Sequence, residues 1–154
     1  MFDAPVDAWY VWLGVALAST TAFGLAASLP DEPPPDAAGV AATVDAVAAS
    51  QHATTATHPL GADAVKLAPN RVALRADGTV AHATFAYGPV VPVVPGSGLW
   101  EVLRGTPPDH AFSSSAEFRH SVESARERPA SWRACEELTV RTVSWEGVDV
   151  TLVG

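Results

Sequence analysis

The sequence predicts an α+β protein, in which an N-terminal transmembrane helix precedes a small domain. In this domain an antiparallel sheet made of two β-hairpins packs with two or three helices. Residues 8–29 contain no charged side chain, which predicts the membrane helix. Asp77-Gly78 and Glu146-Gly147 each separate two runs of alternating apolar and polar residues, a pattern typical of β-hairpins. Helical spacing of apolar residues elsewhere predicts the packing helices.

Four segments follow from this interpretation. Residues 1–7 form an acidic tail, 8–29 the transmembrane helix, 30–36 a proline-rich linker and 37–154 an α+β head domain. The head has the size of one ordinary domain, large enough to bury a core of its own.

The composition is acidic, with 17 Asp and Glu against 9 Lys and Arg and a net charge of -8. This balance argues against nucleic acid or an anionic-lipid patch as a partner. Lys66 is the only lysine and isoleucine is absent, which resembles the usage of salt-adapted archaea, with a GC-rich bacterium as the alternative source. The single cysteine, Cys135, excludes an intrachain disulfide and is expected to be a small buried apolar side chain.

The predicted span of 22 residues would be roughly 33 Å long as a helix, enough to cross a bilayer. The tail before it carries no Lys or Arg, so we expect an uncleaved anchor rather than a signal peptide. Trp9, Tyr10 and Trp12 are candidate membrane-interface anchors. No Lys or Arg lies near either end, so charge does not set the orientation.

Small residues recur every fourth position along the span, at Gly14, Ala18, Ala22 and Ala26. Such a stripe allows close approach of another helix, so the expected partners are the lipid bilayer and other membrane helices, in a homo- or hetero-oligomer. The abundance of alanine also produces such a stripe by composition alone.

Prolines in residues 30–36 end the span, and Asp36 is predicted to cap a helix over 37–51. Its apolar face would contain Val40, Val44, Val47 and Ala48. Residues 51–64 look like a loop, in which His52 and His58 are too few for a metal site. His82, His110 and His120 are not at ligand spacing either.

The first hairpin is predicted over 71–87, with Ala76 opposite Thr79. This register places six side chains on one core face: Val72, Leu74, Ala81, Ala83, Phe85 and Tyr87. Arg71 and Arg75 then point to solvent and are not expected to form a binding patch.

Three prolines in 88–98 exclude a central strand there and allow an edge strand or an extended connection. Residues 99–104 are predicted to form a short helix that packs through Trp100 and Leu103, followed by a turn. Ser114 and Glu117 form a capping box for a helix over 114–128 with Phe118, Val122 and Ala125 on its apolar face.

The second hairpin is predicted to pair Trp145 with Val148, Val143 with Val150 and Arg141 with Leu152. We expect its apolar side chains to complete one core with the first hairpin. The result would be a single antiparallel sheet of four or five strands covered by helices.

No set of residues indicates catalysis, a cofactor or a metal. Ser113, Ser114 and Ser115 lie near Asp109, His110 and His120 in the sequence, but the serines are better explained as helix caps. The glycines match neither a phosphate loop nor a dinucleotide fingerprint. The protein is therefore predicted not to be an enzyme.

The order of tail, span, helix and antiparallel sheet resembles type IV pilin-like and pseudopilin-like proteins. The opening MFDAPVDAWYVWLG is similar to that of an uncharacterised haloarchaeal family of single-span membrane proteins. The resemblance implies a cell-membrane protein with an extracellular head. The chain lacks the basic-Gly processing site of a prepilin, so no residue role is transferred from pilins.

Two functional hypotheses follow. The first is a membrane-anchored, non-enzymatic structural or accessory subunit of a pilus-like or secretion-like cell-surface assembly. The alternative is a membrane-tethered module that binds a ligand or a protein between sheet and helices, which a pocket with converging polar groups would favour.

Overall fold

The computed structural model describes residues 8–27 and 34–154 and divides between residues 33 and 34 into two units. The predicted acidic tail, residues 1–7, lies outside the described residues. So do residues 28–33, which include the end of the predicted span and the start of the linker.

The first unit is the helix α1, Ala8–Ala27. Its alanine content and the lack of internal proline favour a helix. Among the described residues, however, no helix is both long and apolar enough to cross a membrane, so the predicted transmembrane helix is wrong. Part of the reason lies in its composition: alanine and glycine add little apolar area, and the second half contains Ser19, Thr20 and Thr21.

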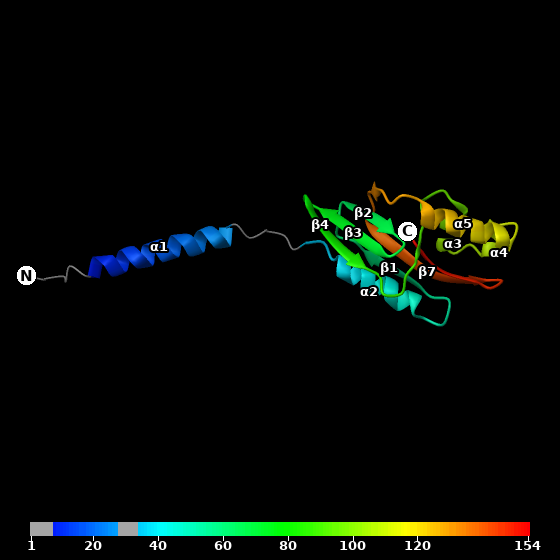
Figure 1. Cartoon of the computed structure of the whole chain (residues 1–154), viewed down its shortest axis with the longest axis horizontal. Helices are drawn as coiled ribbons and strands as arrows, with labels where there is room; N and C mark the ends of the chain where they lie inside the picture. The colour runs from blue at the N-terminus through cyan, green and yellow to red at the C-terminus, as the bar shows by residue number, and fades with distance from the viewer. Residues whose placement is uncertain (1–7, 28–33) are drawn as a thin grey trace, which may run out of the picture. The chain divides into compact units, whose positions relative to one another are not determined.

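The second unit contains four helices and eight strands (Figure 1). In chain order they are α2 (Ala37–Ala48), β1 (Thr55–Pro59), β2 (Ala64–Ala68), β3 (Arg71–Ala76), β4 (Thr79–Thr84), β5 (Val91–Pro92), α3 (Gly98–Leu103), α4 (Pro108–Ala111), α5 (Ser115–Glu127), β6 (Trp132–Arg133), β7 (Glu137–Trp145) and β8 (Val148–Val153). The α+β part of the predicted fold class is confirmed.

The strands form two sheets, where the sequence analysis expected one. Their orders are β1-β7-β8-β5 and β4-β3-β2-β6. All pairings are antiparallel except that of β5 with β8. Each hairpin finds its neighbours in other strands, so the prediction that both hairpins share a sheet is wrong.

Both hairpin registers are confirmed. β3 and β4 pair Ala76 with Thr79, and β7 and β8 pair Trp145 with Val148. In each turn both central residues have positive φ, 47° and 77° in the first and 46° and 79° in the second. These are the type I′ turns that match the twist of antiparallel strands.

The first core surrounds α2, which contacts strands of both sheets. Asp36 caps this helix as predicted, because its carboxylate accepts a hydrogen bond of 2.7 Å from the Gly39 amide. Val40, Val44 and Val47 are buried against both hairpins, whereas Ala48 is half-buried at the end of the helix. The helix ends at Ala48, earlier than predicted.

The second core lies on the other face of the β7–β8 hairpin. Helices α3 and α5 pack there over Val143, Val148, Val150 and Leu152, and Figure 1 shows α3, α4 and α5 grouped together, away from α2. The Ser114 cap and the apolar face of α5 are confirmed: the Ser114 hydroxyl accepts a hydrogen bond from the Glu117 amide, and Phe118 is fully buried. The Glu117 carboxylate accepts from the Ser113 amide, one residue before the position that the predicted capping box requires. The sequence analysis expected these side chains and Trp145 to complete the core of the first hairpin, but they belong to this second core. The second hairpin joins the first core through its other face, with Leu138, Val140 and Val153.

Several local predictions need correction. Residues 51–64 contain β1 instead of a continuous loop, because β1 gains backbone partners from β7, a strand distant in the sequence. The predicted turn after α3 contains the short helix α4. Cys135 is half-buried rather than buried, with Sγ 2.7 Å from the Glu137 carbonyl.

Strand β6 attaches the chain after α5 to the second sheet. Arg133 donates a hydrogen bond of 2.6 Å to the Val93 carbonyl, while its Nη2 is buried without a partner. Burial lowers the pKa of this guanidinium, and the nearby Cys135 acts in the opposite direction.

Candidate binding groove

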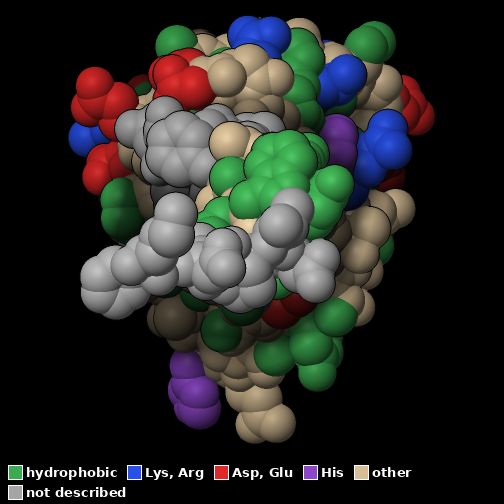
Figure 2. All heavy atoms as spheres, turned by 90° about the vertical axis from the view of Figure 1, so that its left-hand side faces the viewer, with side chains coloured by type: hydrophobic (Ala, Val, Ile, Leu, Met, Phe, Trp, Pro, Cys, Tyr) green, Lys and Arg blue, Asp and Glu red, His purple; other side chains and the backbone are tan. Residues whose placement is uncertain are grey.

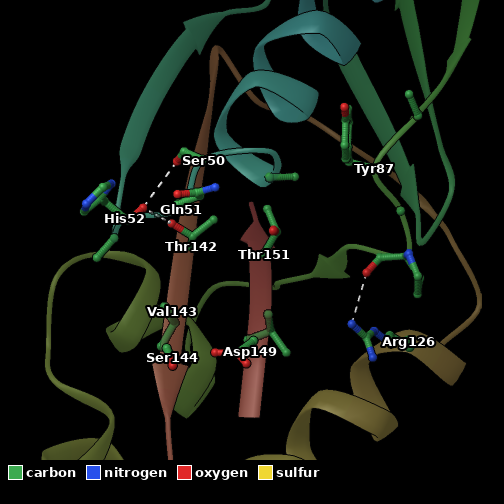
Figure 3. A pocket seen from close by; sticks show the side chains of 16 residues that line it. Ser50, Gln51, His52, Tyr87, Arg126, Thr142, Val143, Ser144, Asp149 and Thr151 are labelled. Carbon is green, nitrogen blue, oxygen red and sulfur yellow. Dashed lines mark hydrogen bonds between the residues drawn. The ribbon is translucent and has the colours of Figure 1, made fainter. Parts of the chain in front are cut away.

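One candidate site is a cavity of about 620 Å³ beside the β7–β8 hairpin, which we name the β8 groove (Figure 3). Ala48 at the end of α2 and residues 50–53 after it line one side, and residues 86–89 with Arg126 of α5 line the other. Its floor comes from residues 142–144 and 149–151 of the two strands.

The floor is polar because the side chains on one face of the hairpin change from apolar to polar along the strands. Leu138, Val140 and Val153 lie on this face under α2 and belong to the first core. Towards the turn, the same face carries Thr142, Ser144, Asp149 and Thr151. α2 ends before it reaches these polar residues, and they are left to line the groove.

The outer edge of β8 is open along the groove. β5 pairs with β8 only at Leu152 and Val153, so residues 148–151 have no strand neighbour on that side among the described residues. In a hairpin with a two-residue turn, Trp145 and Val148 form the first hydrogen-bonded pair. The backbone N–H and C=O of Asp149 therefore point outward, towards the open edge.

Tyr87 is held beside the groove by the neighbouring helix. The carboxylate of Asp45, on α2, accepts hydrogen bonds from the amides of Ala86 and Tyr87. The chain therefore turns away from the first core, and the Tyr87 side chain is 60% exposed. Its predicted place on the core face is wrong, while Val72, Leu74 and Phe85 are buried as predicted.

Arg126 supplies a cation at the same side of the groove (Figure 3). Its Nη2 donates a hydrogen bond of 3.0 Å to the Pro89 carbonyl, which fixes the guanidinium, and its Nε is buried without a hydrogen-bond partner. Within residues 34–154, no ion pair joins this side chain to a carboxylate. The guanidinium is thus available to an anionic group of a ligand.

The loop on the opposite side is anchored to β7 by hydroxyl groups. The Thr142 hydroxyl accepts a hydrogen bond of 2.9 Å from the Thr54 amide. Ser50 Oγ lies 2.9 Å from Thr54 Oγ1 and 3.1 Å from the Val47 carbonyl. These contacts position His52 at the rim (Figure 3).

The residues predicted from the sequence as membrane-interface anchors and as a packing stripe all lie on α1. In α1, Trp9, Tyr10 and Trp12 are exposed, and a Cβ at Gly14 would meet no described atom within 4 Å apart from its chain neighbours and the backbone of its own helix. Ala18 lies on the same helix, while the side chains of Ala22 and Ala26 are outside what the structure describes. The stripe therefore remains a prediction.

The histidines are also separated among different elements. His52 lines the groove, while His58 lies in β1 with Nδ1 2.9 Å from the Thr43 hydroxyl. In the described parts of the chain, no three His, Cys, Asp or Glu side chains are placed to hold a metal ion.

Sequence reasoning missed Tyr87, Arg126 and Asp149 as site residues. A signal was present: Thr142, Ser144, Asp149 and Thr151 alternate with the apolar residues of the second hairpin. A polar face that adjoins a core strand can mark a site, but its neighbours Tyr87 and Arg126 come from distant segments.

A family model described as a family of unknown function, DUF7283, matches residues 3–143. The chain belongs to this family. The match covers α1, the first hairpin with its turn at Asp77-Gly78, and most of the residues that line the groove, and it ends before the turn at Glu146-Gly147. No curated protein and no solved structure matches the chain. The family description includes no pilus or secretion role, so the pilin-like resemblance remains a prediction.

Proposed function

We propose that residues 34–154 form a non-catalytic binding module, which holds an extended peptide segment of a partner protein in the β8 groove. One observation carries this proposal: an open strand edge, residues 148–151, runs along a cavity of about 620 Å³. Strand addition to an open sheet edge is a common mode of peptide recognition, because the backbone supplies the hydrogen bonds.

The groove offers the two kinds of contact that such a segment needs. The outward N–H and C=O of Asp149 would pair with the backbone of the added strand. The exposed ring of Tyr87 would cover one of its side chains from the opposite wall.

Arg126 favours a segment that carries a carboxylate. A guanidinium with no carboxylate partner in the described structure gains a charge-assisted hydrogen bond from an acidic side chain or a C-terminal carboxylate. The preferred peptide is therefore extended, with an acidic group near the Pro89 end of the groove.

Binding is favoured over catalysis because two of the hydroxyls that line the groove, those of Ser50 and Thr142, already have structural contacts. The Ser50 hydroxyl donates hydrogen bonds to the Val47 carbonyl and to Thr54 Oγ1, and the Thr142 hydroxyl accepts a hydrogen bond from the Thr54 amide. The membrane-anchored assembly role predicted from the sequence depended on a span that the described helices do not provide. The binding alternative does not depend on it.

The test is a selection of random displayed peptides on the full chain, followed by fluorescence polarisation of the selected sequences. We expect acidic, extended sequences with saturable binding. Asp149→Pro should weaken binding by about tenfold or more, because it removes an outward N–H. Proline there leaves the β7–β8 ladder intact, since Asp149 is in a non-hydrogen-bonded pair.

Asp149→Ala is the matched control, because it removes the same carboxylate and keeps the N–H. Arg126→Gln is a second variant that leaves the strand edge untouched and should weaken only acidic peptides. Circular dichroism confirms that each variant is folded. Equal binding by Asp149→Pro and Asp149→Ala, or a selection without saturable binders, would refute strand addition.

A further inference from the structure

We propose that the outer face of the sheet β4-β3-β2-β6 carries a second site, which binds a phosphoryl group through Lys66, Arg71 and His82. This site is separate from the β8 groove and shares no lining residue with it. Its test therefore does not depend on the proposed peptide binding.

Strand register brings these side chains to one face. Ala73, at the centre of β3, is opposite Lys66 on β2 and opposite His82 on β4. Arg71 lies two residues from Ala73 and thus on the same face. This face is opposite to the one that carries Val72 and Leu74 into the first core.

A small cavity of about 120 Å³ lies among these residues. Its remaining lining consists of Ala68, Ala73 and Ala130, whose short side chains leave the space open. Pockets for whole small molecules usually measure about 300–1,000 Å³. The size therefore fits one charged group of a ligand rather than an entire nucleotide.

The charge of this face contrasts with that of the protein. The chain has a net charge of -8, yet Lys66, Arg71 and Arg75 share this face, and no acidic side chain lines the cavity. Figure 2 shows basic, histidine and acidic side chains together in the upper part of its view, so the surface as a whole is of mixed charge. Like charges on one sheet face repel one another, and a bound anion would reduce this repulsion.

The Trp132 ring contacts two basic side chains of this face, Lys66 of the proposed site and Arg75 beside it. Lys66 Nζ lies 6.0 Å from the centre of the Trp132 ring, and Arg75 Cζ lies 4.9 Å from it. The nearby Asp63 carboxylate accepts a hydrogen bond from the Asp77 amide at 3.1 Å. Lys66 is therefore held at the cavity by an aromatic ring, which leaves its charge uncompensated.

A phosphoryl group matches these donors better than a single carboxylate does. It has three or four acceptor oxygens and up to two negative charges, and the cavity offers a guanidinium, an ammonium and an imidazole. The shared chemistry is that of free phosphate or of a phosphate monoester. The two sources are distinguished by the experiment.

The test is a titration of the isotope-labelled full chain with inorganic phosphate and with O-phosphoserine, at an ionic strength fixed with sodium chloride. We expect saturable NMR shifts of the Arg71, Ala73 and His82 amides. Tighter binding of one probe identifies free phosphate or a monoester as the source. Lys66→Gln and Arg71→Gln should each weaken binding by about tenfold, the loss of one charge-assisted contact.

Arg119→Gln is the matched control, because it removes one positive charge from an exposed position on α5. The site is supported if this variant binds like the original chain. If Arg119→Gln weakens binding as much as Lys66→Gln, or if neither probe gives saturable shifts, the proposed site does not exist.

Discussion

The carboxylate of Asp45 accepts a hydrogen bond of 2.9 Å from the backbone amide of Tyr87. The two residues are 42 positions apart in the sequence, and the contact joins α2 to the wall of the β8 groove. The same carboxylate holds the Ala86 amide at 3.1 Å. One side chain therefore fixes both the end of the first hairpin and the position of the exposed tyrosine.

Asp45→Ala should lower the free energy of unfolding by about 1 kcal/mol, because two backbone amides lose a charged acceptor. Urea denaturation measures this change. Glu123→Ala removes an exposed carboxylate from another helix and should alter stability by less than about 0.5 kcal/mol. Equal effects of the two substitutions would show that the Asp45 contacts contribute nothing specific.

Gly39→Ala should destabilise the protein although alanine favours helices by about 1 kcal/mol. A Cβ at Gly39 would collide with the Asp36 carboxylate that caps α2. In an Asp36→Ala background the collision is absent, so the same Gly39→Ala change should become stabilising. A double-mutant cycle by thermal or urea denaturation measures this change of sign. Additive effects would contradict the proposed collision.

Phe118→Ala should lower the free energy of unfolding by about 3–5 kcal/mol, because a fully buried ring is removed. The ring contacts Phe112 and Trp145 edge-on, with centroids 5.3 and 5.8 Å away. Val80→Ala, at an exposed position, is the control and should cost less than about 0.5 kcal/mol. A similarly small cost for Phe118→Ala would mean that the second core does not contribute to global stability.

Glu146→Asn should raise the free energy of unfolding by about 0.5 kcal/mol, because Asn adopts positive φ more readily than Glu. Gly147→Ala should lower it by about 1 kcal/mol, since φ at this position is 79°. Urea denaturation of each variant measures its free energy of unfolding relative to that of the original chain. If the two substitutions shift stability in the same direction, the type I′ turn is not what limits the hairpin.

The sequence by itself determined the features that depend on neighbouring residues. Asp36 and Ser114 cap helices, Asp77-Gly78 and Glu146-Gly147 close hairpins in the predicted register, and Phe118 lies on the buried face of α5. Each of these depends on side-chain and backbone contacts within a few positions, so the local pattern was sufficient.

The tertiary structure alone decided how these pieces combine. β1 gains its backbone partners from β7, a strand about 80 residues further along the chain, and the two hairpins belong to separate sheets that both contact α2. The β8 groove and the Lys66 face also join distant segments. The sequence prediction of a membrane span in α1 was wrong, because the absence of charge alone does not establish enough length and apolarity.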